Sequence, residues 1–242
     1  MGPSTREFLS VLSQSGLLPQ ESVALADQLA SQTSSGRDLA IELVRRKLLT
    51  RWQAEQLLFG RTTFQLGQYV LRRKVGSGAT GAVYEARQAG SQKRYAVKVL
   101  APQLSGDREY VARFRREVSL LQTLDHPAVV RCVAAHRIQE TEFLVMEFLP
   151  GRDLSSWIEA RGTISVAAAM RLAERAAQGL AHIHDHGLIH RDIKPSNLIV
   201  WTDRPSKSLQ LKIVDFGLAR HAAGDTAHLT ADNRILGSLD FM

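Results

Sequence analysis

The chain has 242 residues, 44% of them hydrophobic, which is enough for one large domain or for a domain with a smaller module. Its 31 lysines and arginines against 24 aspartates and glutamates give a formal net charge of +7, which favours polyanionic ligands in general. The basic residues are scattered and form no block interleaved with aromatic residues. We therefore expect no nucleic-acid binding.

The single cysteine and the hydropathy pattern indicate where in the cell the protein is expected. Cys132 has no second cysteine to pair with and lies in an alternating apolar segment, so we expect a buried thiol. No window approaches the roughly 20 apolar residues that a membrane-spanning helix needs. The N-terminus also lacks the basic start and apolar run of a secretory signal. These features predict a cytoplasmic protein without a membrane segment.

Residues 1–65 have the pattern of a small helical module. Ser4 and Thr50 each begin a capping box, and Gly16 and Gly60 stand where two helices would end. Between them, apolar residues recur at helical spacing, so we predict four short helices. The segment carries no group of chemically reactive residues. It is either a docking or regulatory module for a protein partner, which we favour, or a passive brace for the domain that follows.

A glycine-rich stretch follows the module. It has the spacing G-x-G-x-x-G-x-V and comprises Gly76, Ser77, Gly78, Ala79, Thr80, Gly81, Ala82 and Val83. Glycines so placed let the backbone approach phosphate groups. Dinucleotide-binding folds use the same spacing, but there the turn opens a helix, whereas residues 82–88 alternate as a strand does. We therefore predict a phosphate-binding hairpin. The next strand, residues 95–100, contains Lys98, which is costly to bury without a partner.

Residues 190–197 read His-Arg-Asp-Ile-Lys-Pro-Ser-Asn and place Asp192, Lys194 and Asn197 within one short loop. Asp215 follows in the triplet Asp-Phe-Gly, directly after an apolar strand. A site that transfers a phosphoryl group needs a carboxylate for the attacking hydroxyl, a positive charge on the phosphate and oxygen ligands for magnesium. These four residues supply all of those groups.

The loop, the triplet and the glycine-rich stretch together resemble the eukaryotic-type (Hanks-type) serine/threonine protein kinases, in their bacterial form, from about Leu66 onward. The resemblance implies an α+β, two-lobe kinase fold after the helical module. Its parts would be an antiparallel β N-lobe with one helix (66–146), a hinge (147–151) and a partial helical C-lobe (152–242). The chain stops before the Ala-Pro-Glu motif of the family, so we expect a truncated kinase domain.

The resemblance also implies a site for ATP. Lys98 would hold the α and β phosphates and pair with Glu117 on the next helix. A solvated glutamate is the alternative there, and Glu109 is the rival acid. The backbone of Glu147 and Leu149 in the hinge would bind adenine. The remaining implied neighbours of the nucleotide are the gatekeeper Met146, Asp153 near the ribose, and the apolar residues Val83, Ala96 and Ile199.

The same resemblance implies roles in catalysis. Asp192 would accept the proton of the substrate hydroxyl, Lys194 would neutralise the γ-phosphate, and Asn197 with Asp215 would hold Mg²⁺ or Mn²⁺. Lysine two residues after the aspartate is the serine/threonine form of the loop. We therefore expect protein substrates with Ser or Thr acceptors, this chain included.

Arg191 implies control by a phosphorylated activation segment, since an arginine beside the catalytic aspartate can pair with a phosphate. Thr230 is favoured over Thr226 as the phosphorylated residue, and the alternative is a threonine without a regulatory role. Two alternatives to a kinase stay open. One is an ATP-binding but inactive kinase fragment, and the other is an interaction protein that acts through residues 1–65.

Overall fold

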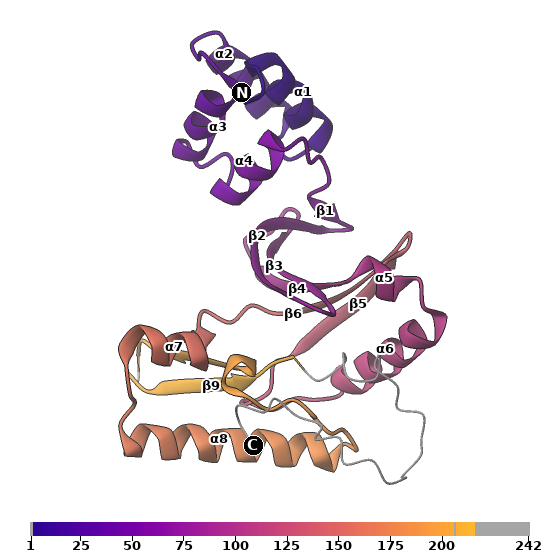
Figure 1. The fold of residues 1–242 in the computed structure, drawn as a ribbon, viewed down its shortest axis with the longest axis vertical. Helices are drawn as coiled ribbons and strands as arrows, with labels where there is room; N and C mark the ends of the chain where they lie inside the picture. The colour runs from indigo at the N-terminus through magenta and orange to yellow at the C-terminus, as the bar shows by residue number, and fades with distance from the viewer. Residues whose placement is uncertain (1, 206, 216–242) are drawn as a thin grey trace. The chain divides into compact units, whose positions relative to one another are not determined.

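The computed structural model describes residues 2–205 and 207–215 of the chain (Figure 1). The chain divides into two compact units. One unit holds Met1–Ser77 with Ala82–Val97, and the other holds Gly78–Gly81 with the residues from Lys98 onward.

The first unit begins with the four predicted helices: α1 (Thr5–Ser15), α2 (Gln20–Ala30), α3 (Gly36–Arg45) and α4 (Arg51–Leu58). Local chemistry explains where they start. Ser4 Oγ accepts from the backbone N–H of Glu7 at 3.3 Å, and the Glu7 carboxylate accepts from the Ser4 N–H at 2.7 Å, which completes a capping box. Gly16 ends α1 in the left-handed conformation, with φ of 61°.

The apolar faces of these helices meet in one core. Trp52 on α4 extends this core toward the strands, since its ring centroid lies 5.8 Å from that of Phe64 and 5.6 Å from that of Tyr84. The buried members are Phe8, Leu12, Ala26, Leu29, Leu39, Ala40, Leu43, Leu49, Ala54, Leu57 and Phe64.

Strands follow the helices: β1 (Gln65–Leu66), β2 (Tyr69–Gly78), β3 (Gly81–Gln88) and β4 (Arg94–Leu100). Two side chains at the start of α4 tie it to β2. Thr50 Oγ1 donates to the Arg72 carbonyl at 2.6 Å, and the buried Gln53 donates from Nε2 to the Leu71 carbonyl at 2.7 Å. Helices α1–α4 therefore share a unit with these strands, and the domain boundary predicted at residue 65 stays a prediction.

The second unit contains a β-hairpin, a small sheet and four α-helices among its described residues. Strands β5 and β6 pair antiparallel, and so do β7, β8 and β9 in a three-stranded sheet. Strand β4 has residues in both units. The elements are α5 (Pro102–Ser105), α6 (Arg108–Leu121), β5 (Cys132–Ile138), β6 (Thr141–Glu147), β7 (Arg152–Asp153), α7 (Leu154–Arg161), α8 (Val166–Asp185), the 3-10 helix η1 (Pro195–Asn197), β8 (Leu198–Thr202) and β9 (Leu209–Ile213).

The long helix α8 packs against β9, as Figure 1 shows. Gly179 lies in close contact with the strand, because a Cβ there would lie 2.9 Å from Ile213 Cδ1 and 3.2 Å from Ala128 Cβ. This packing holds the β8–β9 hairpin in place. Two residues of the candidate site flank the hairpin, since Asn197 directly precedes β8 and Asp215 follows β9. The fold matches the predicted antiparallel sheet lobe and helical lobe. The short elements α5, α7, β1 and β7 were not predicted.

Among the described residues, no helix combines the length and the apolarity that a transmembrane segment requires.

Candidate active site

The loop before β8 brings its three predicted catalytic residues together. The Asn197 side chain donates from Nδ2 to the Asp192 carbonyl at 2.7 Å and to Asp192 Oδ2 at 3.1 Å. Lys194 Nζ lies 2.8 Å from the same Oδ2. Asn197 is buried, whereas Asp192 and Lys194 are partly exposed, so the carboxylate and the ammonium can reach a bound substrate.

His190 ties this loop to the strand that leads to Asp215. Its imidazole is 1% exposed, and Nε2 lies 3.0 Å from the Val214 carbonyl oxygen. The backbone N–H of Asp192 donates to Nδ1 at 3.4 Å, so Nε2 carries the proton and donates. Burial lowers the pKa of His190, which keeps the imidazole neutral. No role was predicted for His190, and its place at the start of the loop motif was the only signal in the sequence.

Asn197 and Asp215, the two predicted metal ligands, lie at the ends of paired strands. The Val214 N–H donates to the Asn197 carbonyl at 2.9 Å, next to the Leu198–Ile213 pair of the β8–β9 ladder. Asp215 has a φ of 61°. A positive φ is uncommon for a residue other than glycine, and such conformations gather at functional sites.

Lys98, near the end of β4, is buried and forms an ion pair with Asp215, 117 residues further along the chain. The pair supplies the partner that a buried lysine requires. The predicted partner of this lysine was Glu117. Glu117 lies on α6, and its pairing with Lys98 stays a prediction.

The end of the glycine-rich stretch is fixed to the chain around Lys98. The Ala101 N–H donates to the Thr80 carbonyl at 3.0 Å. Gly81 has a φ of 142°, and a Cβ there would lie 1.9 Å from the Val99 carbonyl oxygen, so only glycine fits. Gly76 and Ser77 end the first unit's part of β2, while Val83 on β3 and Ala96 on β4 belong to that unit. Their contact with a nucleotide stays a prediction.

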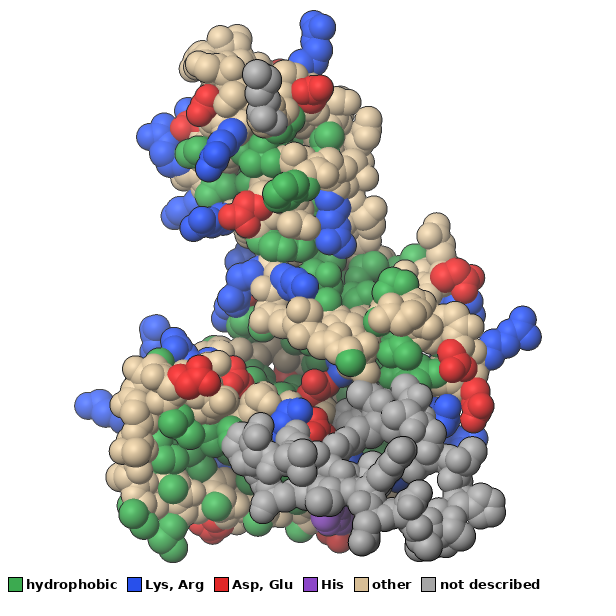
Figure 2. Space-filling view, viewed as in Figure 1, with side chains coloured by type: hydrophobic (Ala, Val, Ile, Leu, Met, Phe, Trp, Pro, Cys, Tyr) green, Lys and Arg blue, Asp and Glu red, His purple; other side chains and the backbone are tan. Residues whose placement is uncertain are grey.

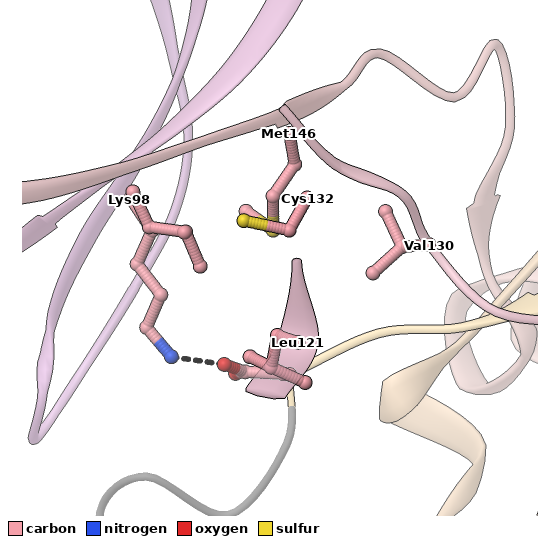
Figure 3. A pocket seen from close by; sticks show the side chains of 7 residues that line it. Lys98, Leu121, Val130, Cys132 and Met146 are labelled. Carbon is pink, nitrogen blue, oxygen red and sulfur yellow. Dashed lines mark hydrogen bonds and ion pairs between the residues drawn. The ribbon is translucent and has the colours of Figure 1, made fainter. Parts of the chain in front are cut away.

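A small, mostly apolar cavity adjoins the Lys98–Asp215 pair (Figure 3). Met146, the predicted gatekeeper, lines it, together with Leu121, Val130, Cys132 and Leu144. Burial raises the pKa of the Cys132 thiol to about 11, so this thiol is not ionised at neutral pH. The prediction of a buried cysteine is confirmed.

The predicted hinge is anchored by the side chain of its first residue. Glu147 Oε1 accepts from the Arg131 N–H at 2.8 Å and pairs with Lys212 of β9. The Leu149 N–H donates to no backbone carbonyl among the described residues. No local pattern in the sequence pointed to Lys212, because the pair spans 65 residues.

Asp153 and Ile199, both predicted beside the nucleotide, are cross-strand partners of β7 and β8. The Asp153 carboxylate also caps α7, since it accepts from the Ser156 N–H at 2.9 Å and from the Ser156 hydroxyl at 2.7 Å. This capping gives Asp153 a structural role that needs no nucleotide. Contact of Asp153 with a ribose stays a prediction.

Some predicted features lie outside the described residues. They are Phe216 and Gly217 of the Asp-Phe-Gly triplet and the threonines Thr226 and Thr230. Arg191, the predicted phosphate-binding residue, is described and has a φ of 63°.

Asn197 and Asp215 suit a hard divalent cation. Both side-chain hydrogen bonds of Asn197 within the described ranges use its amide nitrogen, and its Oδ1 accepts none there. The Asp215 side chain is 45% exposed. Carboxylate and amide oxygens are the ligands that Mg²⁺ prefers. Residues 2–205 and 207–215 hold no cluster of three or more His, Cys, Asp or Glu side chains that could bind a metal. The fit therefore rests on this pair.

The antiparallel strands and the helices have the arrangement that the sequence predicted for a protein kinase domain. A comparison with protein families agrees, since residues 69–242 match the family described as the protein kinase domain. The chain belongs to the protein kinase family.

Individual relatives are bacterial and fungal kinases. The chain is 35% identical over 177 residues to the serine/threonine-protein kinase pkn2 of Myxococcus xanthus, an alignment that covers 73% of this chain and 21% of pkn2. The chain thus spans about a fifth of the length of that relative.

Among solved structures, the Mycobacterium tuberculosis PknI kinase domain (C20A_R136A double mutant) aligns with a TM-score of 0.57 at 25% identity, over 64% of this chain and 60% of that one. Rad53 1-466 in complex with AMP-PNP aligns with a TM-score of 0.56 at 30% identity, over 69% and 43% of the two chains.

Proposed function

We propose that this chain is the ATP-binding part of a protein serine/threonine kinase, which transfers the γ-phosphate of ATP to Ser or Thr hydroxyls of proteins, itself included. The observation that carries the proposal is the connection of Asp192, Lys194 and Asn197 in one hydrogen-bonded loop, which His190 joins to the strand before Asp215. A carboxylate, a cation and the proposed metal-binding pair would thereby be held in one place by the loop and the β8–β9 hairpin.

In the proposed reaction, the Asp192 carboxylate orients the substrate hydroxyl and accepts its proton. The hydroxyl oxygen forms a bond to the γ-phosphorus, and the bond from that phosphorus to the oxygen shared with the β-phosphate breaks. The products are ADP and a phosphorylated serine or threonine. Lys194 offsets the negative charge on the transferred group, and Lys98 holds the remaining phosphates.

Asn197 and Asp215 would hold the divalent cation, which when bound neutralises phosphate charge. Mg²⁺ is the expected ion, and Mn²⁺ has the same ligand preference for oxygen. The adenine would bind the hinge through the carbonyl of Glu147 and the N–H of Leu149, whose lack of a described backbone partner supports this assignment. The solved complex of the similar Rad53 with AMP-PNP supports an adenine nucleotide as the ligand.

Regulation is proposed through Arg191 and the activation segment, with Thr230 favoured over Thr226 as its phosphorylated residue. The cytoplasmic location expected from the sequence also stays a prediction. An ATP-binding but inactive protein is the competing function, and it predicts nucleotide binding without transfer. An interaction protein that acts through residues 1–65 predicts partner binding that is independent of Asp192.

The test is phosphate incorporation from labelled ATP with Mg²⁺ into a generic basic protein and into the chain itself. Wild type is compared with Asp192→Asn, which keeps an acceptor for Asn197 but removes the base and the partner of Lys194. The matched control is Asp185→Asn at the exposed end of α8. We expect transfer by wild type and by the control, and a loss of about 100-fold or more in Asp192→Asn.

ATP-dependent change in melting temperature separates the alternatives. Stabilisation by ATP with no transfer in wild type would favour the inactive protein. Transfer that survives Asp192→Asn would contradict the assigned base.

A further inference from the structure

The helical module of the first unit carries a large groove whose lining no catalytic role explains. The groove lies between α3 and α4 and is bordered by the first residues of the described chain, Gly2 and Pro3. Ile41 and Phe59 belong to its lining and are 60% and 86% exposed. Hydrophobic side chains of this module reach the surface between charged ones (Figure 2). Exposed apolar groups that line a concave surface mark a site for binding rather than a part of the core.

Helix α3 presents a regular stripe to the groove. Its lining residues are Arg37, Ala40, Ile41 and Val44, at positions i, i+3, i+4 and i+7. This spacing is one face of a helix, with a cation at the N-terminal end and small or apolar residues after it.

Helix α4 presents the same spacing from the other side. Arg51, Ala54, Glu55 and Leu58 line the groove at i, i+3, i+4 and i+7. Two helices that offer such stripes side by side form ridges between which the ridges of a third helix pack. The alanines of the two stripes, Ala40 and Ala54, are buried, so the contacts offered to a third helix come from larger lining side chains such as Ile41.

The charged residues that line the groove indicate which charge a docked helix should carry. Arg37 has no ion pair within the described part of the chain, and Arg51 pairs only with Glu55 across an exposed contact, with side chains 88% and 49% exposed. An exposed pair of this kind contributes little and exchanges readily. Arg37 and Arg51 outnumber Glu55, the one acid of the lining. An acidic residue on the docked molecule can therefore form an ion pair with one of these arginines.

We propose that this groove docks an amphipathic helix of a partner protein, with apolar residues at i, i+3, i+4 and i+7 and an acidic residue beside that face. The opposite side of α4 is anchored to β2 by Thr50 and Gln53. The docked helix is thereby held in a fixed place on the first unit. This proposal is independent of phosphoryl transfer.

The test uses the full chain and a display library of 16-residue helical peptides with apolar residues at those four positions and randomised flanks. The enriched peptides are expected to carry Glu or Asp at the flanks. The dissociation constant of a synthesised, enriched peptide is then measured by fluorescence anisotropy for wild type and for variants.

Ile41→Asp and Arg37→Glu are each expected to weaken binding by about tenfold or more, and Arg37→Glu is expected to recover affinity for a peptide with Lys in place of its Glu. Gln14→Asp, which adds the same charge on an exposed position of α1, is the matched control and is expected to bind as wild type does. If Ile41→Asp fails to fold, Phe59→Asp replaces it, since that side chain is almost fully exposed.

Three results would overturn the proposal. The first is that no peptide is enriched. The second is that the enriched peptides carry basic flanks. The third is that peptide binding is unchanged in Ile41→Asp and Phe59→Asp. Sedimentation of the chain alone tests whether a second copy of the chain fills the groove. A dimer that Ile41→Asp dissociates would show that a second copy fills the groove and would contradict a partner helix.

Discussion

The imidazole of His190 donates from Nε2 to the carbonyl oxygen of Val214 at 3.0 Å. One hydrogen bond thus joins the loop that carries Asp192 to the strand end that carries Asp215. The imidazole end of this bond is enclosed, since His190 is 1% exposed. The neutral imidazole is required, because a protonated ring would turn the Nδ1 that accepts from the Asp192 N–H into a donor.

Stability is expected to fall below the ordinary pKa of histidine. Burial lowers the pKa of His190 in the folded chain, so at pH values below about 6.5 the unfolded chain binds more protons and is favoured. Urea unfolding at about pH 7.5 and about pH 5.5 measures the difference. The variant His190→Gln, which does not titrate, should show a smaller loss. His126, whose pKa is also lowered by burial, is present in both proteins and cancels in the comparison. Equal pH dependence in the two proteins would contradict the role given to His190.

Gly81→Ala is expected to destabilise the chain by about 1–3 kcal/mol and to weaken stabilisation by ATP. The added Cβ would lie 1.9 Å from the Val99 carbonyl oxygen, next to Lys98, so the strand must move. Gly78→Ala is the matched control from the same stretch, since a Cβ there meets nothing within 4 Å. Thermal melts with and without ATP and Mg²⁺ measure both effects. A Gly81→Ala protein that melts like the Gly78→Ala protein would show that the close approach is not needed.

Gln53→Ala is expected to lower the free energy of unfolding by about 1–3 kcal/mol, because it leaves the Leu71 carbonyl without its 2.7 Å donor in a buried place. Gln56→Ala on the same helix removes only a 3.5 Å surface contact with Arg61 and should cost far less. Denaturant unfolding of both variants provides the comparison. Equal losses would mean that α4 is held to β2 by its apolar contacts alone.

Glu147→Ala is expected to lower stability by about 1–3 kcal/mol, since the partly buried Lys212 and the Arg131 N–H both lose their acceptor. It should also weaken binding of an ATP analogue, because the hinge backbone is then less fixed. The control is Glu140→Ala, whose carboxylate is 84% exposed in its pair with Arg137. Calorimetric titration and thermal melts measure the two effects. Unchanged affinity with reduced stability would limit Glu147 to a structural role.

Much of the fold was predictable because its signals are local. Capping boxes at Ser4 and Thr50, and apolar residues at helical spacing, placed all four helices of the module. The spacing of Asp192, Lys194 and Asn197 fixed their mutual approach, since five residues of chain allow few arrangements. The short elements α5 and α7 were missed because they have four and eight residues and neither has the capping box that marked the equally short α4.

The spacing of residues along the chain was enough to select Lys98, Asp192, Lys194, Asn197 and Asp215 as candidate site residues, but it missed His190 and Lys212. The pairing of residues that are distant in the chain became visible only in three dimensions. Lys98 pairs with Asp215 across 117 residues, Glu147 with Lys212 across 65, and Gln53 reaches Leu71 across 18. Any of the acids in the chain could have served Lys98 by charge alone. The choice depends on how α8 and the β8–β9 hairpin pack in three dimensions, and a one-dimensional pattern does not contain that packing.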